Sequence, residues 1–253
     1  MTSSDDRINY LDHAATTPVR PEVLEKMLPY FIEKFGNPSS LYALAGEARY
    51  GLDEAREQVA TVLGSRTSEV VFTGGGSESN NLAIKGIAGL QQTHDGVRGH
   101  IITTAVEHHA VLHPIEQLEK MGFDATYVGV NKTGRVDPEE FAAAVRPDTF
   151  FASVMLVNNE VGNIQDVATI SKLISEASEH HQTRVLLHTD AVQAAGKLSL
   201  NVDELAVDLM SLSGHKIYGP KGVGALYVRR GVEIDPLIAG GGQENQRRSG
   251  TEN

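Results

Sequence analysis

Short apolar runs alternate with helix-like segments along most of the chain, and this alternation constrains the fold more than any other feature. The runs are rich in β-branched residues, as buried parallel strands are. They occupy residues 70–73, 100–104, 125–130, 150–157, 185–189, 207–212 and 225–228. Helices that connect successive parallel strands cross over the sheet and cover both of its faces. The pattern therefore predicts an α/β fold with a mostly parallel, seven-stranded sheet.

Several of the predicted helices have recognisable ends. Pro21 and Pro138 stand where a first helical turn accepts proline, and Gly64 follows a helix end, where glycine is favoured. Ahead of the first helix we expect an irregular arm over residues 1–18, with a short extended piece at 8–11. The helices are expected at residues 21–35, 46–63, 77–90, 110–121, 137–145 and 166–180.

Length, charge and composition exclude several classes of protein. The 253 residues, 40% of them hydrophobic, suffice for one large α/β domain or for one domain plus a fragment. A net charge of -11 argues against a large nonspecific nucleic-acid surface. Without a signal-peptide pattern or an apolar run of roughly 20 residues, we expect a cytoplasmic protein. The absence of cysteine excludes disulfides, thiolate metal sites and thiol nucleophiles from this chain.

Lys216 follows the strand predicted at 207–212 and the turn Ser213-Gly214. Because ligands bind at the C-terminal edge of open parallel sheets, this position holds an amine near a site. A lysine that is buried or that lies beside another cation becomes nucleophilic and can form a Schiff base with a carbonyl compound. His215 and Lys221 are candidates for such neighbours. A solvated surface lysine is the alternative for this residue taken alone.

The segment Ser213-Gly-His-Lys-Ile-Tyr-Gly-Pro-Lys-Gly222 resembles the cofactor-lysine segment of the cysteine desulfurases, pyridoxal 5'-phosphate (PLP) enzymes of the class V aminotransferase group. The resemblance extends from Tyr10-Leu-Asp-His-Ala-Ala-Thr-Thr-Pro18 to Arg248-Ser-Gly-Thr-Glu-Asn253. It implies the type I fold of PLP-dependent transferases, with residues 1–18 as an arm of a small domain and 19–253 as the large PLP-binding domain. It also implies that the N-terminal arm lies near the active site. Family members are longer, so we expect the family's C-terminal small domain to be absent.

The resemblance assigns the cofactor lysine and two of its neighbours. Lys216 matches the residue that holds PLP as a Schiff base and that removes the substrate's α-proton once the substrate has displaced it. Ser213 and His215, which flank Lys216, match ligands of the cofactor's phosphate.

A glycine run, Thr73-Gly-Gly-Gly-Ser-Glu-Ser-Asn-Asn81, lies between a predicted strand and a predicted helix. Glycines let backbone amides approach a ligand, and the helix N-terminus adds free N–H donors, so the place suits a phosphate. It is not a Walker A loop, because the Gly-Lys-Ser/Thr ending is missing. By resemblance it is the PLP phosphate loop, with Gly76 and Ser77 at its cofactor contacts. Many relatives have Ala-Thr at these two positions.

Three histidines fall in Glu107-His-His-Ala-Val-Leu-His113. His109 and His113 stand four apart on a predicted helix, which is the spacing of a metal pair, but no HExxH pattern or third ligand is evident. We therefore favour a solvated or capping cluster over a metal site. The resemblance implies that His108 stacks on the pyridine ring of PLP and shuttles protons, which suits an imidazole that titrates near neutrality.

Asn159, Asp190 and Gln193 follow two of the predicted strands. A carboxylate at a buried strand end must be paired or it takes up a proton, and a protonated pyridine nitrogen is a suitable partner because it keeps the ring electron-withdrawing. The resemblance gives this role to Asp190, a contact with the ring's phenolic oxygen to Gln193, and a place beside that oxygen and the substrate carboxylate to Asn159. A helix cap is the alternative for Asp190, and a structural turn is the alternative for the amide pair Asn158-Asn159.

Residues 240–251 combine a flexible backbone with two arginines and a hydroxyl, and alone they fit a disordered basic loop equally well. In the resembled enzymes the threonine that matches Thr251 reaches the phosphate of the partner subunit's cofactor. The resemblance thus implies a homodimer in which each site is built from both chains.

The activity implied by the resemblance is conversion of L-cysteine to L-alanine, with sulfur passed as a persulfide to an acceptor. An iron–sulfur scaffold and a tRNA-thiolation enzyme are both candidates for that acceptor. In the family, a cysteine thiolate on a mobile loop attacks the substrate sulfur, and this chain has no cysteine. We therefore expect a fragment or a truncated relative with the PLP-binding residues but without the nucleophile or the arginine that binds the substrate carboxylate.

Three alternatives stay open. Another class V enzyme, such as an aminotransferase or a selenocysteine lyase, would share the ring-binding residues. A noncatalytic regulatory or scaffold protein would fold without binding the cofactor. A histidine-based metal protein would bind metal stoichiometrically and would be unaffected by PLP.

Overall fold

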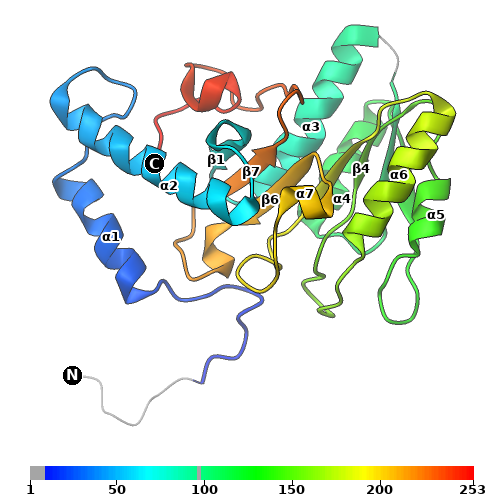
Figure 1. The fold of residues 1–253 in the computed structure, drawn as a ribbon, viewed down its shortest axis with the longest axis horizontal. Helices are drawn as coiled ribbons and strands as arrows, with labels where there is room; N and C mark the ends of the chain where they lie inside the picture. The colour runs from blue at the N-terminus through cyan, green and yellow to red at the C-terminus, as the bar shows by residue number, and fades with distance from the viewer. Residues whose placement is uncertain (1–8, 96–97) are drawn as a thin grey trace.

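The computed structural model describes residues 9–95 and 98–253 (Figure 1). At its centre is a seven-stranded sheet in the order β1-β7-β6-β5-β4-β2-β3. Strand β7 runs antiparallel to β1 and β6, and the other neighbouring strands pair in parallel. The strands are β1 Val70–Thr73, β2 His100–Thr104, β3 Asp124–Val128, β4 Thr149–Ser153, β5 Leu186–Asp190, β6 Leu209–Ser213 and β7 Gly224–Val228. The predicted α/β fold with a mostly parallel, seven-stranded sheet is confirmed.

All six predicted helices are present, and their bounds shift by a few residues. They are α1 Pro21–Ile32, α2 Ala43–Leu63, α3 Gly76–Asp95, α4 His109–Lys120, α5 Pro138–Ala143 and α6 Val167–His181. The second helix begins earlier than predicted because good helix formers precede Gly46. The structure adds the one-turn helix α7 and three 3-10 turns, namely α7 Val202–Leu205, η1 Thr67–Glu69, η2 Gly214–Lys216 and η3 Gln243–Gln246.

Two predicted extended segments were wrong in part. The run at 150–157 leaves the ladder after Ser153, although Val154 and Leu156 stay buried and donate their N–H groups to carbonyls of β5. The apolar run is therefore longer than the strand because the residues that follow the strand are also buried. Of the piece expected at 8–11, Ile8 lies outside the described residues, as does the tail 1–7, and 9–11 form no strand.

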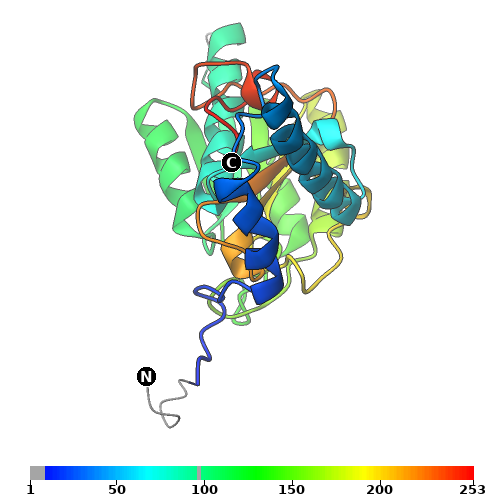
Figure 2. The same ribbon diagram turned by 90° about the vertical axis from the view of Figure 1, so that its left-hand side faces the viewer.

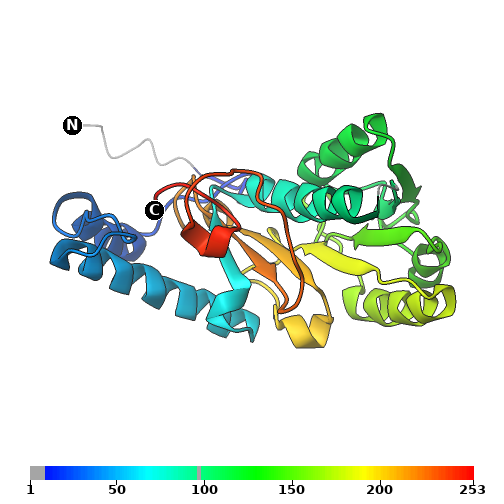
Figure 3. The same ribbon diagram turned by 90° about the horizontal axis from the view of Figure 1, so that it is seen from above.

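Helices cover both faces of the sheet, as predicted (Figure 3). On one face, apolar side chains of α3 and α4 such as Leu82 and Ile115 pack against the strands. On the other, α5 and α6 contribute Phe141 and Ile170, and the end of α2 contributes Leu63. Because both faces are filled, open polar surface for a ligand is left at the ends of the strands.

Helices α1 and α2 extend from one end of the sheet, away from the crossover helices (Figure 1). Within the described ranges no residue of α1 is buried. The C-terminal segment returns to α2 and β1 (Figure 2). There the Arg56 guanidinium donates to both carboxylate oxygens of Glu244 at 2.7 and 2.8 Å, and the Phe72 N–H donates to the same carboxylate at 3.0 Å.

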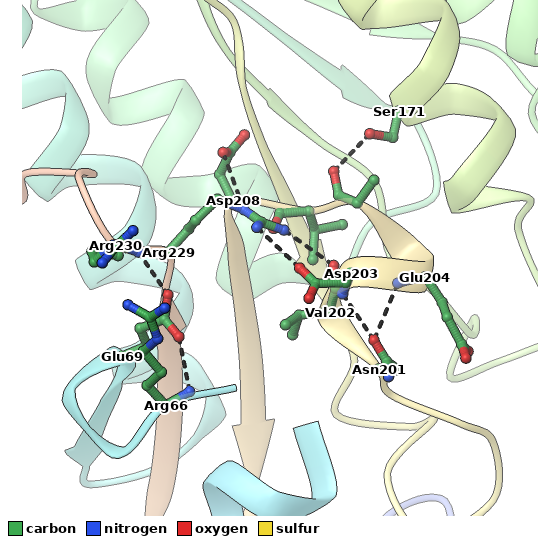
Figure 4. Close-up of polar contacts among 12 residues, drawn as sticks. Arg66, Glu69, Ser171, Asn201, Val202, Asp203, Glu204, Asp208, Arg229 and Arg230 are labelled. Atoms are coloured by element: carbon green, nitrogen blue, oxygen red, sulfur yellow. Dashed lines mark hydrogen bonds and ion pairs between the residues drawn. The ribbon is translucent and has the colours of Figure 1, made fainter. Parts of the chain in front are cut away.

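Ionic and capping contacts bind the edge of the sheet where β6 begins and β7 ends (Figure 4). The Asp208 carboxylate accepts the Leu187 N–H at 2.9 Å, and burial raises the pKa of this aspartate. The Arg229 guanidinium donates to Asp203 at 3.2 Å and to the carbonyl of Val207 at 3.0 Å. These contacts join α7, β6 and β7 and stabilise this end of the strands.

Within residues 9–95 and 98–253, the structure contains no helix with both the length and the apolar character needed to cross a bilayer.

Candidate functional site

A cavity of about 810 Å³ lies at the edge of the sheet where the parallel strands end. Its wall is formed by the starts of α3 and α4, the ends of β5 and β6, the segment after β4 and the N-terminal arm. Nine of the ten residues predicted to bind the cofactor line this one cavity. They are Gly76, Ser77, His108, Asn159, Asp190, Gln193, Ser213, His215 and Lys216.

The glycine turn joins β1 to α3 at one end of the cavity. Gly75 has a φ of 146°, which side chains rarely tolerate, and a Cβ on Gly76 would lie 2.8 Å from a methyl of Val192 and 3.3 Å from the Cβ of Ser213. The tight packing seats the first turn of α3, with Ser77, beside the end of β6. Free N–H groups of a helix N-terminus thus meet two serine hydroxyls in one corner.

Lys216 stands in η2, directly after β6. Its Nζ donates to the carbonyls of Ala14 and Ala15, the second at 2.7 Å. Burial is the main cause that lowers its pKa, with a further lowering by Lys197, while Asp12 and Asp190 act in the opposite direction. A lowered pKa increases the fraction of neutral, nucleophilic amine at a given pH.

The cationic neighbour of Lys216 differs from the candidates drawn from the sequence. The positive charge that lowers its pKa is that of Lys197, whose Nζ donates to the Gln193 carbonyl at 2.9 Å. His215 and Lys221 were the wrong candidates for this effect. The influence runs the other way, because burial and then the charges of Lys216 and Lys221 lower the pKa of His215.

Asp190 is the last residue of β5 and is buried at the floor of the cavity. Its carboxylate accepts the Val192 N–H at 2.9 Å and an N–H of the Asn80 side chain at 2.7 Å. Burial raises its pKa, and these two hydrogen bonds lower it. Both partners are neutral, so the site can accommodate a cation next to this carboxylate.

His108 precedes α4 and caps it: its Nδ1 accepts the Ala110 N–H at 3.0 Å. Because Nδ1 accepts this hydrogen bond, the ring proton lies on Nε2, which is then a donor. His109 and His113 do share a face of α4, with rings stacked at 4.8 Å. Among the described residues, no three His, Cys, Asp or Glu side chains converge as a metal site.

Of the two adjacent amides, Asn158 stabilises a turn and Asn159 lines the cavity. Asn158 is buried, and its Oδ1 accepts the N–H groups of Glu160 and Val161 at 2.9 Å each, as the structural-turn alternative expects. Asn159 lines the cavity, where its side chain donates to Glu160 at 2.7 Å. Only the second amide is therefore available to a ligand.

The N-terminal arm closes one side of the cavity, as the resemblance implies. The Ala14 carbonyl accepts hydrogen bonds from Lys216 and from the Gln193 side chain, the latter at 2.8 Å. The Thr16 hydroxyl lies 3.0 Å from Nδ1 of His215. Three predicted cofactor residues therefore share the arm as a partner, and the sequence provided no periodic signal for these contacts.

Thr251 is the one predicted residue that does not line the cavity of its own chain; it is exposed beyond η3. The same segment nevertheless touches the glycine turn. Arg248 donates to Glu78 at 2.9 Å, and the other oxygen of Glu78 accepts the Gly74 N–H at 2.7 Å. The role of Thr251 stays a prediction.

Two buried residues beside Asp190, Asn80 and Glu107, were not singled out in the sequence. Asn80 follows the glycine turn by one helical turn of α3, and that spacing could have indicated it. Glu107 directly precedes His108, and its Oε1 accepts the Thr104 hydroxyl and the Met155 N–H at 2.8 Å each. Complete burial raises the pKa of Glu107 to about 8.

Comparison with known proteins gives one consistent family. The model of the aminotransferase class-V family matches residues 9–252. The chain is 52% identical over 244 residues to the cysteine desulfurase IscS of Dictyoglomus turgidum, which is 96% of this chain and 60% of that protein. Its fold is similar to that of a NifS-like protein, with a TM-score of 0.91, 44% identity and coverage of 96% of this chain and 65% of the other.

A second solved structure, titled SspA in complex with cysteine, matches with a TM-score of 0.89 and 44% identity, covering 96% of this chain and 68% of the other. The chain spans about 60% of the length of the curated relatives that it matches.

Proposed function

Because the chain belongs to the aminotransferase class-V family, we propose that its cavity is the PLP site of a cysteine desulfurase. The proposed reaction converts L-cysteine to L-alanine and passes the sulfur on as a persulfide. The observation that carries the proposal is the convergence of an amine, a buried carboxylate and a glycine turn at a helix start on one cavity. The similarity to a cysteine desulfurase over 96% of the chain supports this reaction among those of the family.

The residues present fit the cofactor. Asp190 is a buried carboxylate with two neutral partners, so the pyridinium nitrogen would supply the missing cation. The N–H groups at the start of α3, with the hydroxyls of Ser77 and Ser213, suit the phosphate. Lys216 supplies the amine for the aldehyde, and the Gln193 side chain lies within the same wall. Bound PLP would supply an electron-withdrawing ring that stabilises negative charge on the substrate's α-carbon.

The chain's own residues then perform binding and proton transfer. Lys216, with its lowered pKa and its two carbonyl partners on the arm, is placed to take a proton from the substrate's α-carbon. His108 lines the cavity at the start of α4, where it would cover the ring and could donate its Nε2–H. Asn159 would offer an uncharged donor to the substrate carboxylate, and Asp190 would favour the cationic form of the ring nitrogen.

The substrate and the sulfur acceptor are also proposals. The structure of SspA with cysteine supports L-cysteine as the ligand of such a site. None of the 253 residues is a cysteine, so the persulfide would form on a thiol that this sequence does not contain. An iron–sulfur scaffold or a tRNA-thiolation enzyme would then take the sulfur.

We further propose the assembly that the family resemblance implies. Residues 19–253 would form the PLP-binding domain and 1–18 an arm that belongs to a small domain. In a homodimer, Thr251 would reach the phosphate in the partner's cavity, which agrees with its exposure here. A cytoplasmic location and a role in iron–sulfur assembly stay predictions.

Exchange of the α-proton tests this function without requiring a thiol. The PLP-loaded chain is mixed with L-cysteine or with L-alanine in D₂O, and deuterium uptake at the α-carbon is followed by NMR. We expect exchange with both amino acids and a loss of about 10²- to 10⁴-fold in Lys216→Ala, since a positioned base contributes that much. If the cofactor binds and neither amino acid exchanges, the desulfurase proposal fails although the cofactor site stands.

A further inference from the structure

Two buried side-chain atoms beside the cavity lack a hydrogen-bond partner among the residues that the structure describes. They are Oδ1 of Asn80 and Oε2 of Glu107. Buried polar atoms are nearly always hydrogen-bonded, so each such atom needs an explanation. The two differ in chemistry, since one is an amide carbonyl and the other belongs to a carboxyl group.

Both residues border the same carboxylate. Asn80 donates its side-chain N–H to Oδ2 of Asp190 at 2.7 Å, and its carbonyl Oδ1 points elsewhere. The negative charge of Asp190 acts on Glu107 and adds to the effect of burial on that group. Glu107 lies three residues after β2 and Asn80 lies in α3, and each of them interacts with the residue that ends β5.

The hydrogen-bond pattern of Glu107 shows where a proton would reside. Its Oε1 already accepts two hydrogen bonds, from the Thr104 hydroxyl and the Met155 N–H. With a pKa of about 8, the carboxyl is mostly protonated near neutral pH. The proton then belongs on Oε2, and a carboxylic O–H there is a donor that needs an acceptor. The carbonyl of Asn80 is an acceptor that needs a donor.

We propose that Glu107 is a positioning residue of this site: its Oε2–H donates to Oδ1 of Asn80, directly or through one buried water, and the amide of Asn80 thereby stays turned toward Asp190. The chain Glu107–Asn80–Asp190 satisfies both unpartnered atoms and fixes which end of the amide faces the aspartate. The carboxylate of Asp190 then always accepts a hydrogen bond from the Asn80 side chain, which fixes the orientation of the carboxylate. The link to the pyridine nitrogen rests on the proposed function, but the hydrogen-bond chain does not.

Infrared difference spectroscopy of the cofactor-free protein tests the chain directly. Near neutral pH, the spectrum of wild type minus Glu107→Gln should contain the C=O stretch of a protonated carboxyl. Glutamine keeps an acceptor at Oε1 and offers an N–H donor in place of the O–H, so this variant should fold. In Asn80→Leu the same band should move, because the acid loses its acceptor. Absence of the band in the first comparison, or an unmoved band in the second, overturns the proposal.

Cofactor affinity provides the second arm. Glu107→Leu and Asn80→Leu should each weaken PLP binding about tenfold, the equivalent of one lost hydrogen bond, whereas Glu107→Gln keeps a donor and should recover most of the affinity. Circular dichroism and thermal melts show whether the three variants are folded. Equal affinities in wild type and Asn80→Leu would contradict the positioning role. If wild type itself binds no PLP, the proposed function fails, while the infrared result still decides the hydrogen-bond chain.

Discussion

Asp190 places a buried carboxylate at the cavity. Burial disfavours the carboxylate, and the hydrogen bonds from Asn80 and Val192 only partly oppose that effect. A cationic ring nitrogen placed against it would restore the balance. Lys216 is the converse case, an amine whose ammonium form burial disfavours. In the proposed complex, Asp190 would contact the ring nitrogen of PLP and Lys216 its aldehyde.

Asp190→Asn should lower PLP affinity about tenfold or more, because a charge-assisted contact becomes a neutral one. Absorbance titration with PLP measures the dissociation constant. The control is Asp166→Asn, which changes an equal charge at the N-cap of α6 while keeping an acceptor for the Thr169 N–H. An unchanged affinity in Asp190→Asn would remove the aspartate from the site.

Glu107 should give stability a pH dependence with a definite sign. Its pKa is about 8 in the folded state and 4.5 in the reference state, so the folded protein binds more protons between these values. The free energy of unfolding should therefore fall as pH rises from about 4.5 to 8, by at most about 1.4 kcal/mol per pH unit. Glu107→Gln should abolish this component, which urea unfolding at several pH values would measure.

The free energies of unfolding of wild type and Glu107→Gln must be subtracted at each pH, because two buried histidines change stability with the opposite sign. Burial lowers the pKa of His100 to about 4 and of His188 to about 3, so their contribution to stability grows as pH rises toward the ordinary histidine pKa. Parallel pH curves for wild type and Glu107→Gln would show that Glu107 is ionised in the folded state.

The N-terminal arm is the element whose position sequence patterns could not supply. Its contacts depend on Thr17, whose hydroxyl donates to the His215 carbonyl at 2.9 Å and accepts the Tyr218 N–H at 2.7 Å. Tyr218 has a φ of 64°, in the left-handed region, and the threonine satisfies its amide. Neither contact has a periodicity, so the resemblance alone indicated that the arm lies near the site.

Thr17→Val should lower the free energy of unfolding by about 1–3 kcal/mol, because the buried hydroxyl of Thr17 is lost and the half-buried Tyr218 N–H loses its acceptor. Urea unfolding measures the loss, and hydrogen exchange should show faster exchange over residues 10–18. Thr17→Ser keeps the hydroxyl and should retain more of the stability. A loss in Thr17→Val no larger than in Thr17→Ser would contradict the role of the hydroxyl.

Among the contacts of the C-terminal segment is a largely buried ion pair between Arg56 and Glu244. Glu244, Asn245 and Gln246 have φ values of 48°, 56° and 66°, an unfavourable backbone for three residues that are not glycine. The contact between Arg56 and Glu244, with side chains 15% and 3% exposed, keeps this turn in place.

Glu244→Ala should destabilise the protein by about 3–5 kcal/mol, because it leaves the Arg56 charge without its partner. The released turn should make trypsin cleave faster after Arg247, which limited proteolysis would measure. Asp53→Ala is the control, since it removes an exposed pair with Arg49 at 3.6 Å and should leave the cleavage rate unchanged. Equal rates in Glu244→Ala and wild type would show that other contacts hold the segment.

At the scale of the whole molecule, the two ends of the strands carry different groups. Contacts around Asp208 and Arg229 join the elements at one end (Figure 4), and nine of the ten predicted cofactor residues line the cavity at the other. Apolar runs sufficed to predict the sheet and the helices, because burial on both faces leaves a strong signal. Strand-end positions then brought Asp190, Ser213 and Lys216 together.

Contacts between distant side chains left no such signal. Asn80 and Asp190 are 110 residues apart, and their pairing depends on how α3 packs across β5. The buried state of Glu107 likewise depends on Met155, which follows another strand. Periodicity reports which face of an element is buried, but it does not report which neighbour a polar side chain meets there.

The most direct test of the central claim is to identify the lysine that binds PLP. The protein is loaded with PLP, reduced with borohydride, digested and mapped by mass spectrometry, with Lys216→Arg and Lys197→Arg treated in parallel. We predict a single adduct on Lys216, lost in Lys216→Arg and retained in Lys197→Arg. An adduct on another lysine, or its persistence in Lys216→Arg, would contradict the assignment of this cavity as the PLP site.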